Sequence, residues 1–388
     1  MRQPVHVVYG CAHLFKADTA ARLGRIALAS FEKFNAREAF DVEPSVMVSV
    51  ANKLEREPVE DYRIDFEDGY GIRSDSEEDD HARAAARAVA AGGVANSLPP
   101  FIGIRIKPLN HESRTRSLRT LELFLRELAA TDATRLPANF VVTLPKLTDP
   151  AEPAGLAAKL DTLERELGIP PGTIRMEIMI ETPQAFMAAD GASNLPRFLA
   201  AGAGRITGAH FGPYDYTSSI GIAANAQDLS HPACDMARHM MQIAYAPSGI
   251  HLSDGPTNVM PVGNDAGAVH AAWRLHWGNV RHALRMGFYQ GWDLHPAQLV
   301  SRYAAVYGFY HGGLEQAAAR LRNFVDRVAQ ASMVGQQFDD AATGRGLLNF
   351  FRRAIDCGAV SKEDVQERTG LGREALDAAS FHGITSPR

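Results

Sequence analysis

Two acidic residues follow two strand-like runs of this sequence. Glu181 comes directly after the run IRMEIMI, and Asp215 lies a few residues after the run RITGAHF. Carboxylate oxygens are preferred ligands of hard divalent cations, and the carboxyl ends of barrel strands meet at one rim. The pair therefore predicts a divalent cation at one rim of a barrel, an arrangement that is more often catalytic than structural.

A metal site with only two protein ligands leaves coordination positions open. A magnesium ion on Glu181 and Asp215 would keep those positions for water and for the oxygen atoms of a substrate. Arg105 could then hold a substrate carboxylate with its planar guanidinium group while the ion polarises a neighbouring keto or enolate oxygen. This combination predicts cleavage of a carbon–carbon bond through an enolate.

Polar residues also lie at or just after the ends of the other strand-like runs. Each of them alone could be a helix cap or an ion-pair partner, because loops after strands are usually polar. Their recurrence along the chain favours an active site, since the carboxyl rim of a barrel carries the loops that surround a substrate. The set comprises Asp65, Glu67, Asp68, Arg105, Lys146, Glu181, Asp215, Asp254 and His295.

The segment DFED at 65–68 has two open interpretations. It could surround the metal site, where it steadies bound water or orients Arg105, or it could form a simple internal ion pair. A buried cluster of carboxylates is costly without positive charge, so Arg105, Lys146 or a metal ion is expected next to it. The segment ETP at 181–183 places a proline where a helix can begin, and the positive end of that helix would face the anionic site.

The elements that must position these residues alternate between strands and helices. Eight short apolar or β-branched runs are separated by helical patterns such as residues 81–93 and 147–168. Strands this apolar are typical of a parallel sheet covered by helices, and eight such units predict a closed (β/α)8 TIM barrel. The runs are VHVVYG (5–10), YRIDFE (62–67), FIGIRI (101–106), FVVTLPK (140–146), TIRMEIMIE (173–181), RITGAHF (205–211), SGIHL (248–252) and FYQGWDLH (288–295).

Two parts of the chain fall outside the eightfold pattern. A ninth run, SVMVSV at 45–50, does not fit the count and is interpreted as part of an insertion between the first and second units. After about residue 300 the pattern becomes wholly helical. The sequence thus predicts a barrel over residues 1–300, with an insertion near 35–60, and a C-terminal helical extension over 301–388 that packs with the barrel as one body.

Composition favours a small-molecule partner. The chain has 388 residues, with 40 basic and 45 acidic side chains and a formal charge of −5, so no global field would attract nucleic acid or a membrane surface. No apolar signal core or membrane-spanning run is present, which predicts a soluble, cytoplasmic protein. The three cysteines lie far apart and predict neither a disulfide framework nor a zinc site. Serine hydrolase and P-loop motifs are missing from the sequence.

Six segments of the sequence resemble the citrate lyase beta-subunit-like family, which groups with malyl-CoA lyases and HpcH/HpaI-type metal-dependent aldolases. The last three are fairly specific together, whereas the first three are weak alone. They span most of residues 1–300 in the family's order. They are DFED (65–68), IRI (104–106), LPK (144–146), IETPQA (180–185), HFGPYDYTSSIG (210–221) and GFYQGWDLHPAQL (287–299).

The resemblance implies a (β/α)8 barrel, a homo-oligomer such as a trimer or hexamer, and magnesium on Glu181 and Asp215. It also implies that Arg105 binds the carboxylate of the substrate or enolate product. An aspartate from the C-terminal region of a neighbouring subunit assists some relatives, and FDDAATGRGLL (338–348) resembles that segment, which makes Asp339 or Asp340 a candidate. The remaining candidate site residues of this sequence are Glu67, Asp68 and Lys146 as catalytic residues and Gly212 and Pro213 as substrate-binding residues.

Several segments depart from the family pattern. The first strand reads VYGCAH in place of a Val-Pro-Gly turn, DFED continues into Gly-Tyr-Gly, and RIK replaces Arg-x-Asn. These changes touch loops that shape the substrate pocket, so whether the substrate is a free acid or a CoA thioester stays open.

Three functions are compatible with this sequence. The leading hypothesis is a magnesium-dependent carbon–carbon lyase or aldolase that acts on a small hydroxy or keto acid or its CoA thioester. A second is an acyl-CoA thioesterase at the same metal centre, which would need Asp339 or Asp340 to position a water molecule. A third is a lyase subunit that depends on an acyl-carrier partner.

Overall fold

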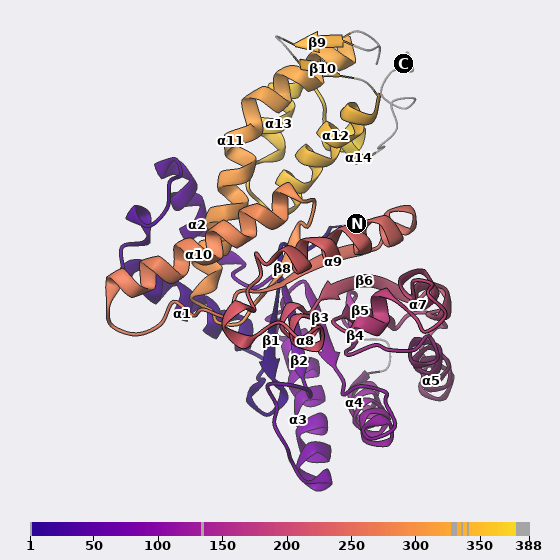
Figure 1. Cartoon of the computed structure of the whole chain (residues 1–388). Coiled ribbons are helices and arrows are strands. Elements are labelled where there is room, and N and C mark those ends of the chain that lie inside the picture. The colour runs from indigo at the N-terminus through magenta and orange to yellow at the C-terminus, as the bar shows by residue number, and fades with distance from the viewer. Residues whose placement is uncertain (1, 133–135, 327–331, 335–336, 340, 378–388) are drawn as a thin grey trace.

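Eight parallel strands close into a barrel in sequence order, with β8 paired to β1. The computed structural model describes residues 2–132, 136–326, 332–334, 337–339 and 341–377. The prediction of a (β/α)8 barrel is confirmed, and each of the eight runs contributes one strand (Figure 1). The strands are β1 (His6–Cys11), β2 (Asp61–Asp65), β3 (Phe101–Arg105), β4 (Phe140–Leu144), β5 (Arg175–Ile180), β6 (Ile206–Phe211), β7 (His251–Pro256) and β8 (Gln290–Asp293).

Helices surround this barrel and connect its strands (Figure 1). Their amphipathic faces bury apolar residues against the sheet, as expected for a parallel barrel. The helices up to residue 285 are η1 (Ala12–Leu14), α1 (Thr19–Lys33), η2 (Ala36–Glu38), α2 (Pro44–Arg56), α3 (Asp75–Val94), α4 (Arg114–Asp132), α5 (Ala151–Leu167), α6 (Pro183–Phe186), α7 (Leu195–Ala201), α8 (Pro213–Ser219), η3 (Ala224–Ala226), α9 (Pro232–Tyr245), η4 (Ala246–Ser248) and α10 (Ala266–Arg285).

The ninth run, SVMVSV, is helical and forms the first half of α2. A helix forms here because the buried residues Val46, Met47, Val50 and Leu54 recur with helical spacing, and Pro44 begins the helix at its first turn. Helix α2 packs against α1 and α11, so the insertion joins the first and last units of the barrel.

The chain after residue 300 is mostly helical, with one exception. Helix α11 (Gln298–Asp326) belongs to the eighth barrel unit and runs across the predicted domain boundary. Two short antiparallel strands, β9 (Ser332–Val334) and β10 (Gln337–Asp339), follow it, so the prediction of a wholly helical pattern was wrong there. The remaining helices are α12 (Ala341–Asp356), α13 (Lys362–Thr369) and α14 (Arg373–Asp377).

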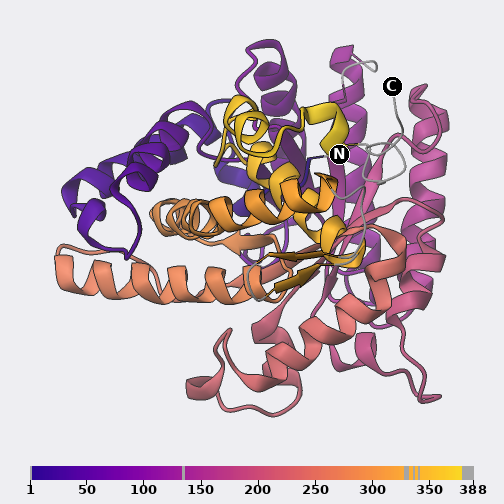
Figure 2. The same ribbon diagram turned by 90° about the horizontal axis from the view of Figure 1, so that it is seen from above.

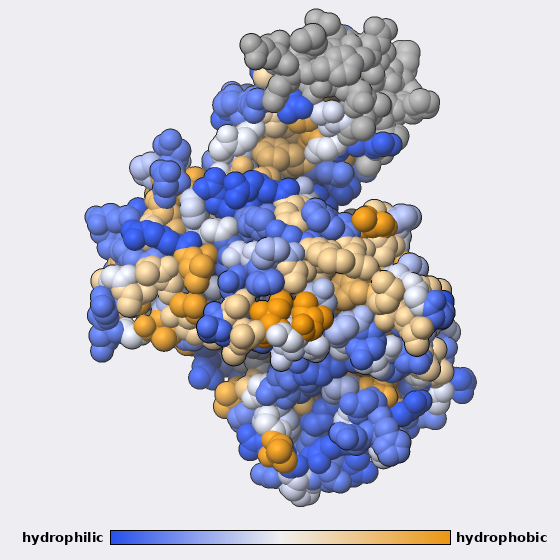
Figure 3. All heavy atoms as spheres, viewed as in Figure 1, coloured by the Kyte–Doolittle hydropathy of each residue, from blue (hydrophilic) through white to orange (hydrophobic). Residues whose placement is uncertain are grey.

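The C-terminal helices α12 and α13 pack on α11. From above, these C-terminal elements lie over one end of the barrel (Figure 2). The space-filling view shows the same part projecting from the barrel, with hydrophilic residues predominant over the face that is shown (Figure 3). Within the described ranges, no helix combines the length and apolar character needed to cross a bilayer.

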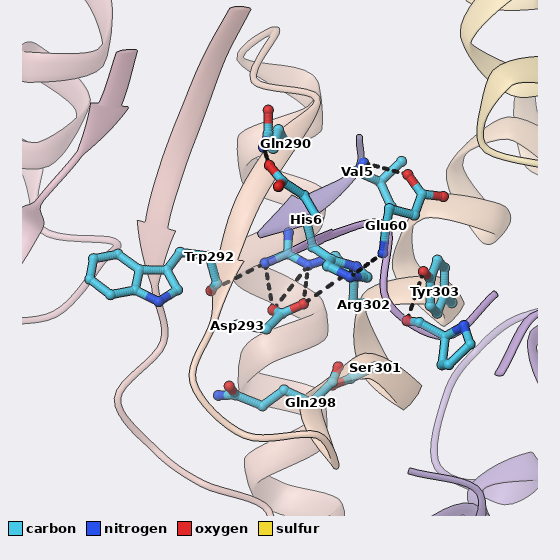
Figure 4. A network of polar contacts seen from close by, with 12 residues as sticks. Val5, His6, Glu60, Gln290, Trp292, Asp293, Gln298, Ser301, Arg302 and Tyr303 are labelled. Carbon is cyan, nitrogen blue, oxygen red and sulfur yellow. Dashed lines mark hydrogen bonds and ion pairs between the residues drawn. The ribbon is translucent and has the colours of Figure 1, made fainter. Parts of the chain in front are cut away.

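A buried ionic network seals the seam between β1, β8 and the helices outside them (Figure 4). Asp293, at the end of β8, accepts a hydrogen bond from Nη2 of Arg302 at 2.7 Å and lies 3.0 Å from Nε2 of His276. Burial opposes ionisation of Asp293, but Arg302 and then His276 hold its pKa below the usual range. His6 accepts a hydrogen bond at Nε2 from the backbone N–H of Glu60 at 3.1 Å, and burial lowers its pKa to about 4. At this seam, Asp293 is therefore ionised and paired with Arg302 and His276, whereas His6 is neutral.

A second charged layer lies inside the barrel. Arg63 donates hydrogen bonds to Asp61, to Glu177 at 2.5 Å and to the hydroxyl of Thr143 at 3.0 Å. The imidazole of His210 lies 2.7 Å from the same carboxylate of Glu177. Burial works against ionisation of Glu177, and the charges of Arg63 and His210 lower its pKa. The guanidinium of Arg63 thus has a partner on each side.

Candidate functional site

The polar cluster predicted from the sequence lies at the carboxyl rim of the barrel, because every strand runs in the same direction. β2 ends at Asp65 and the next loop carries Glu67 and Asp68, while β3 ends at Arg105. Lys146 follows β4, Glu181 follows β5, and Asp215 lies in the first turn of α8 after β6. Neighbouring strands thus bring these side chains to one part of the rim.

Arg105 is held in place by Asp65. Its Nε and Nη2 atoms donate to the two oxygens of Asp65 at 2.7 and 2.6 Å, which is the bidentate geometry of a guanidinium and a carboxylate. Its Nη1 atom lies 3.1 Å from an oxygen of Glu67 and 3.6 Å from an oxygen of Asp68. Of the two interpretations of DFED, the structure shows Asp65 in a direct ion pair that also fixes the orientation of Arg105.

Two aromatic rings that the site prediction did not include support the guanidinium of Arg105. Its Cζ atom lies 4.7 Å from the ring centroid of Tyr9 and 5.3 Å from that of Trp292. The two rings lie 4.2 Å apart, and such cation–π contacts favour a buried cation. A signal for Tyr9 existed in the sequence, because the first strand reads VYGCAH where related proteins carry a proline.

Lys146 links three of the acidic residues. Its Nζ atom lies 2.6 Å from Glu67, 2.7 Å from Asp68 and 3.7 Å from Asp215. Its backbone N–H donates to Oε1 of Glu181 at 2.6 Å. Lys146 has a φ of 52°, a left-handed conformation that is unusual for a residue other than glycine. The strained backbone therefore aims one N–H at Glu181 while the side chain serves three other carboxylates.

Glu181 is buried without a cationic partner. Its exposed fraction is 1%, and no described lysine or arginine side chain lies within ion-pairing distance of it. Burial, and after it the negative charge of Asp215, raises the pKa of Glu181 to about 8. Burial also raises the pKa of Asp215, while Lys146 opposes that shift. Both carboxyls thus lie in surroundings that resist negative charge.

Gly212 gives the carboxylate of Glu181 its space. A Cβ atom added to Gly212 would lie 2.3 Å from Oε2 of Glu181, closer than nonbonded atoms can approach. The next residue, Pro213, packs against Gly255, where an added Cβ would lie 2.2 Å from the Cδ atom of Pro213. The loop between β6 and α8 can therefore reach the carboxylate only with glycine at 212.

The residues at this rim fit a hard divalent cation. The acidic side chains here offer oxygen atoms as metal ligands, and five carboxylates face the two cations Arg105 and Lys146. The five are those of Asp65, Glu67, Asp68, Glu181 and Asp215. The raised pKa of Glu181 is what an adjacent cation would reverse. Across the residues that the structure describes, no group of three or more histidine, cysteine or acidic side chains is arranged as a metal site. A cation held by Glu181 and Asp215 would thus keep open positions.

Other residues of the predicted set lie outside this cluster. Asp254 is buried in an ion pair with Arg238, whose Nε donates to it at 2.9 Å. His295 accepts a hydrogen bond at Nδ1 from the backbone of Ala297, which stabilises the start of α11. Asp254 is thus an ion-pair partner within β7, and His295 is a helix cap, which are the structural alternatives that the sequence left open. Asp339 contributes its backbone to β10, and Asp340 lies outside the described residues.

The start predicted for a helix at ETP is present but short. Thr182 caps α6 by accepting a hydrogen bond from the backbone N–H of Ala185 at 3.2 Å, and Pro183 occupies the first helical position. The helix ends at Phe186, after a single turn. So short a helix contributes little dipole, and the environment of Glu181 depends mainly on burial and on Asp215.

Comparisons with known proteins show what the chain is similar to. A model of the family described as a domain of unknown function, DUF6986, matches residues 1–384. The chain is 29% identical over 154 residues to the L-malyl-CoA/beta-methylmalyl-CoA lyase of Haloarcula marismortui, and the match covers 39% of this chain and 41% of that protein. The chain thus matches about two fifths of the length of this curated relative.

Two solved structures have the same fold. A citrate lyase from Burkholderia xenovorans LB400 has a TM-score of 0.63 and 21% identity, with 94% of this chain and 96% of that chain covered. The malate synthase of Haloferax volcanii, in its magnesium/glyoxylate complex, has a TM-score of 0.53 and 17% identity, with 97% of each chain covered. Together with the curated relative, these matches confirm the resemblance to citrate lyase beta-subunit-like proteins.

Proposed function

The chain belongs to the DUF6986 family, and we propose that it is a magnesium-dependent carbon–carbon lyase or aldolase for a small hydroxy or keto acid or its CoA thioester. The observation that carries the proposal is Glu181, a buried carboxyl beside Asp215 that has no cationic side-chain partner among the residues that the structure describes. A fold rarely keeps such a group unless a ligand or substrate compensates for it.

Glu181 and Asp215 would hold the magnesium ion through their carboxylate oxygens. When bound, the ion would supply Lewis-acid stabilisation of negative charge on a substrate oxygen. The malate synthase of Haloferax volcanii forms a complex with magnesium and glyoxylate, which supports this choice of cofactor. Gly212 and Pro213 would line the substrate pocket, because the backbone at 212 lies against the carboxylate of Glu181.

Arg105 would bind the carboxylate of the substrate with Nη1. Its other two donor atoms are occupied by Asp65, so Asp65 acts as a positioning residue. Nη1 faces Glu67 and Asp68, and a bound substrate carboxylate would take over that contact from them. Lys146 would hold the two displaced acids through its ammonium group.

Glu67 is the proposed proton carrier. Burial raises its pKa, while the charge of Arg105 opposes the shift. One oxygen accepts from Lys146 and the other faces Nη1 of Arg105, so a proton taken up at the second oxygen, Oε2, would lie beside the bound substrate. Asp68 is held by Lys146 in the same way and would keep the ammonium group charged.

We further infer a homo-oligomer, a trimer or hexamer, in which Asp340 or its neighbour Asp339 completes the site of an adjacent subunit. The basis is the resemblance of residues 338–348 to the C-terminal segment of malyl-CoA lyases. The curated relative is named for CoA thioesters of hydroxy acids, which makes malyl-CoA the first substrate to test and the cytoplasm the expected compartment.

The decisive experiment measures glyoxylate release from malyl-CoA by the full chain after EDTA treatment, with and without added magnesium. Activity should require magnesium, and Glu181→Gln should lower kcat/KM about a thousandfold, which corresponds to about 4 kcal/mol. Gly212→Ala should also lower it, because the new Cβ displaces the Glu181 carboxylate. Glu55→Gln, on the exposed face of α2, is the matched control and should retain full activity.

Three outcomes would contradict the proposal. Full activity after removal of the metal would exclude the metal centre. Free CoA without glyoxylate would favour the thioesterase alternative. Activity that requires a carrier protein would favour a carrier-dependent subunit.

A further inference from the structure

A polar cavity of about 400 Å³ lies between the barrel and helix α12, away from the carboxyl rim. Its barrel side begins where β7 begins, at the opposite end of that strand from the rim. Its other side is formed by Asn349, Arg352, Arg353 and Asp356 of α12. The volume is in the range of small-molecule sites.

Two arginines that lack a carboxylate partner line this cavity. Over the described parts of the chain, no acidic side chain lies within ion-pairing distance of Arg352 or Arg353. Arg353 stacks on the ring of Tyr289, with its Cζ atom 3.7 Å from the centroid, which leaves its N–H edges free. The acidic residue in the lining, Asp356, is already paired with Arg373 at 2.7 Å.

Asp356 is the acidic residue among those that line the cavity, and the amide of Asn349 adds a neutral hydrogen-bond donor. Burial lowers the pKa of His251; the charge of Glu177 opposes this shift, and the charges of Arg353 and Arg352 add to it. The cavity therefore offers positive charge and hydrogen-bond donors, and its acid is compensated.

We propose that this cavity binds a small anion that carries carboxylate or phosphate groups, with Arg352 and Arg353 as its donors. Guanidinium groups match both kinds of oxyanion. Because both arginines belong to α12 and the facing lining belongs to the barrel at the start of β7, the anion would lie between the C-terminal helices and the barrel.

The test uses the full chain in EDTA, at constant ionic strength, with citrate and with inorganic phosphate as separate probes. Calorimetry should detect binding of at least one probe, and thermal unfolding should shift upward with its concentration. Arg352→Gln and Arg353→Gln should each weaken binding at least about tenfold. Arg22→Gln, an exposed arginine on α1, is the matched control and should bind as the unmodified protein does.

A second measurement needs no variant. The bound anion should slow the reaction of phenylglyoxal with Arg352 and Arg353, as read by peptide mass spectrometry, and leave the rate at Arg22 unchanged. Absence of binding by both probes would overturn the proposal. So would binding that Arg352→Gln and Arg353→Gln leave intact, because it would place the anion elsewhere. Neither readout depends on lyase activity, so this site and the proposed catalytic function can fail separately.

Discussion

Glu181 and Asp293 are buried carboxyl groups at the ends of barrel strands, but their surroundings shift their pKa values in opposite directions. Asp293 contacts Arg302 and His276, which hold its pKa low, whereas burial and Asp215 raise the pKa of Glu181 to about 8. Among the described residues, the same barrel thus pairs one buried acid with cations and leaves the other without a cationic side chain in ion-pairing distance. Under the proposed function, the first group serves stability and the second is available to a ligand.

The largest expected effect on stability is at Asp293. Asp293→Asn should lower the free energy of unfolding by about 3–5 kcal/mol, because it leaves the buried charge of Arg302 uncompensated. Glu181→Gln should instead raise it by up to about 3 kcal/mol at pH 7 without metal, because the unfolded chain ionises Glu181 at this pH whereas the folded chain keeps it mostly protonated, and glutamine does not have that cost. Urea unfolding in EDTA, followed by circular dichroism, measures both. Equal losses in the two variants would contradict the comparison.

A pH titration sharpens the comparison at His6, whose ring lies next to Asp293. The folded pKa of about 4 is below the unfolded value of 6.5, so the unfolded chain binds more protons between these values. Stability should therefore be fully present above pH 6.5 and decrease as pH falls to 4, by about 3 kcal/mol from this group. Urea unfolding across that range should show that the free energy of unfolding depends less steeply on pH in His6→Gln than in the unmodified protein. An unchanged slope would exclude His6 as the source.

The smallest expected effect is at Tyr9, which supports the charge of Arg105. The Tyr9 hydroxyl is buried and has no partner among the described residues, so Tyr9→Phe should change stability by less than about 0.5 kcal/mol. Tyr9→Leu removes the ring under the guanidinium and should cost about 1 kcal/mol more. Thermal and urea unfolding of the two variants compare them. A large loss with Tyr9→Phe would show that the hydroxyl has an essential partner.

The sequence was most informative where the apolar residues of a segment followed one clear pattern. Eight apolar runs predict eight strands because each is too apolar to face water, and all eight form the barrel. The run SVMVSV was listed beside the strand-like runs because β-branched residues are common in strands. The helical spacing of Val46, Val50 and Leu54 becomes clear only over the longer segment. The short strands β9 and β10 gave no comparable signal.

The site was predictable in part for a similar reason. Residues at the ends of parallel strands must meet at one rim, so Arg105, Lys146, Glu181 and Asp215 could be assigned to one region before their contacts were known. The sequence could not separate Glu181 from Asp254, because whether a strand-end acid has a cationic partner depends on a distant helix. Asp254 has such a partner, Arg238 of α9.

The pairing of β1 with β8, together with the packing of α2 on α11, also determines when the barrel can close during translation. β1 keeps one edge unpaired until β8, which ends at Asp293, has been translated. During that interval an unprotected strand edge is open to wrong pairing with other nascent chains. The barrel can therefore close only after β8 has been made, and a premature stop before β8 would leave one of the two edges of β1 unpaired.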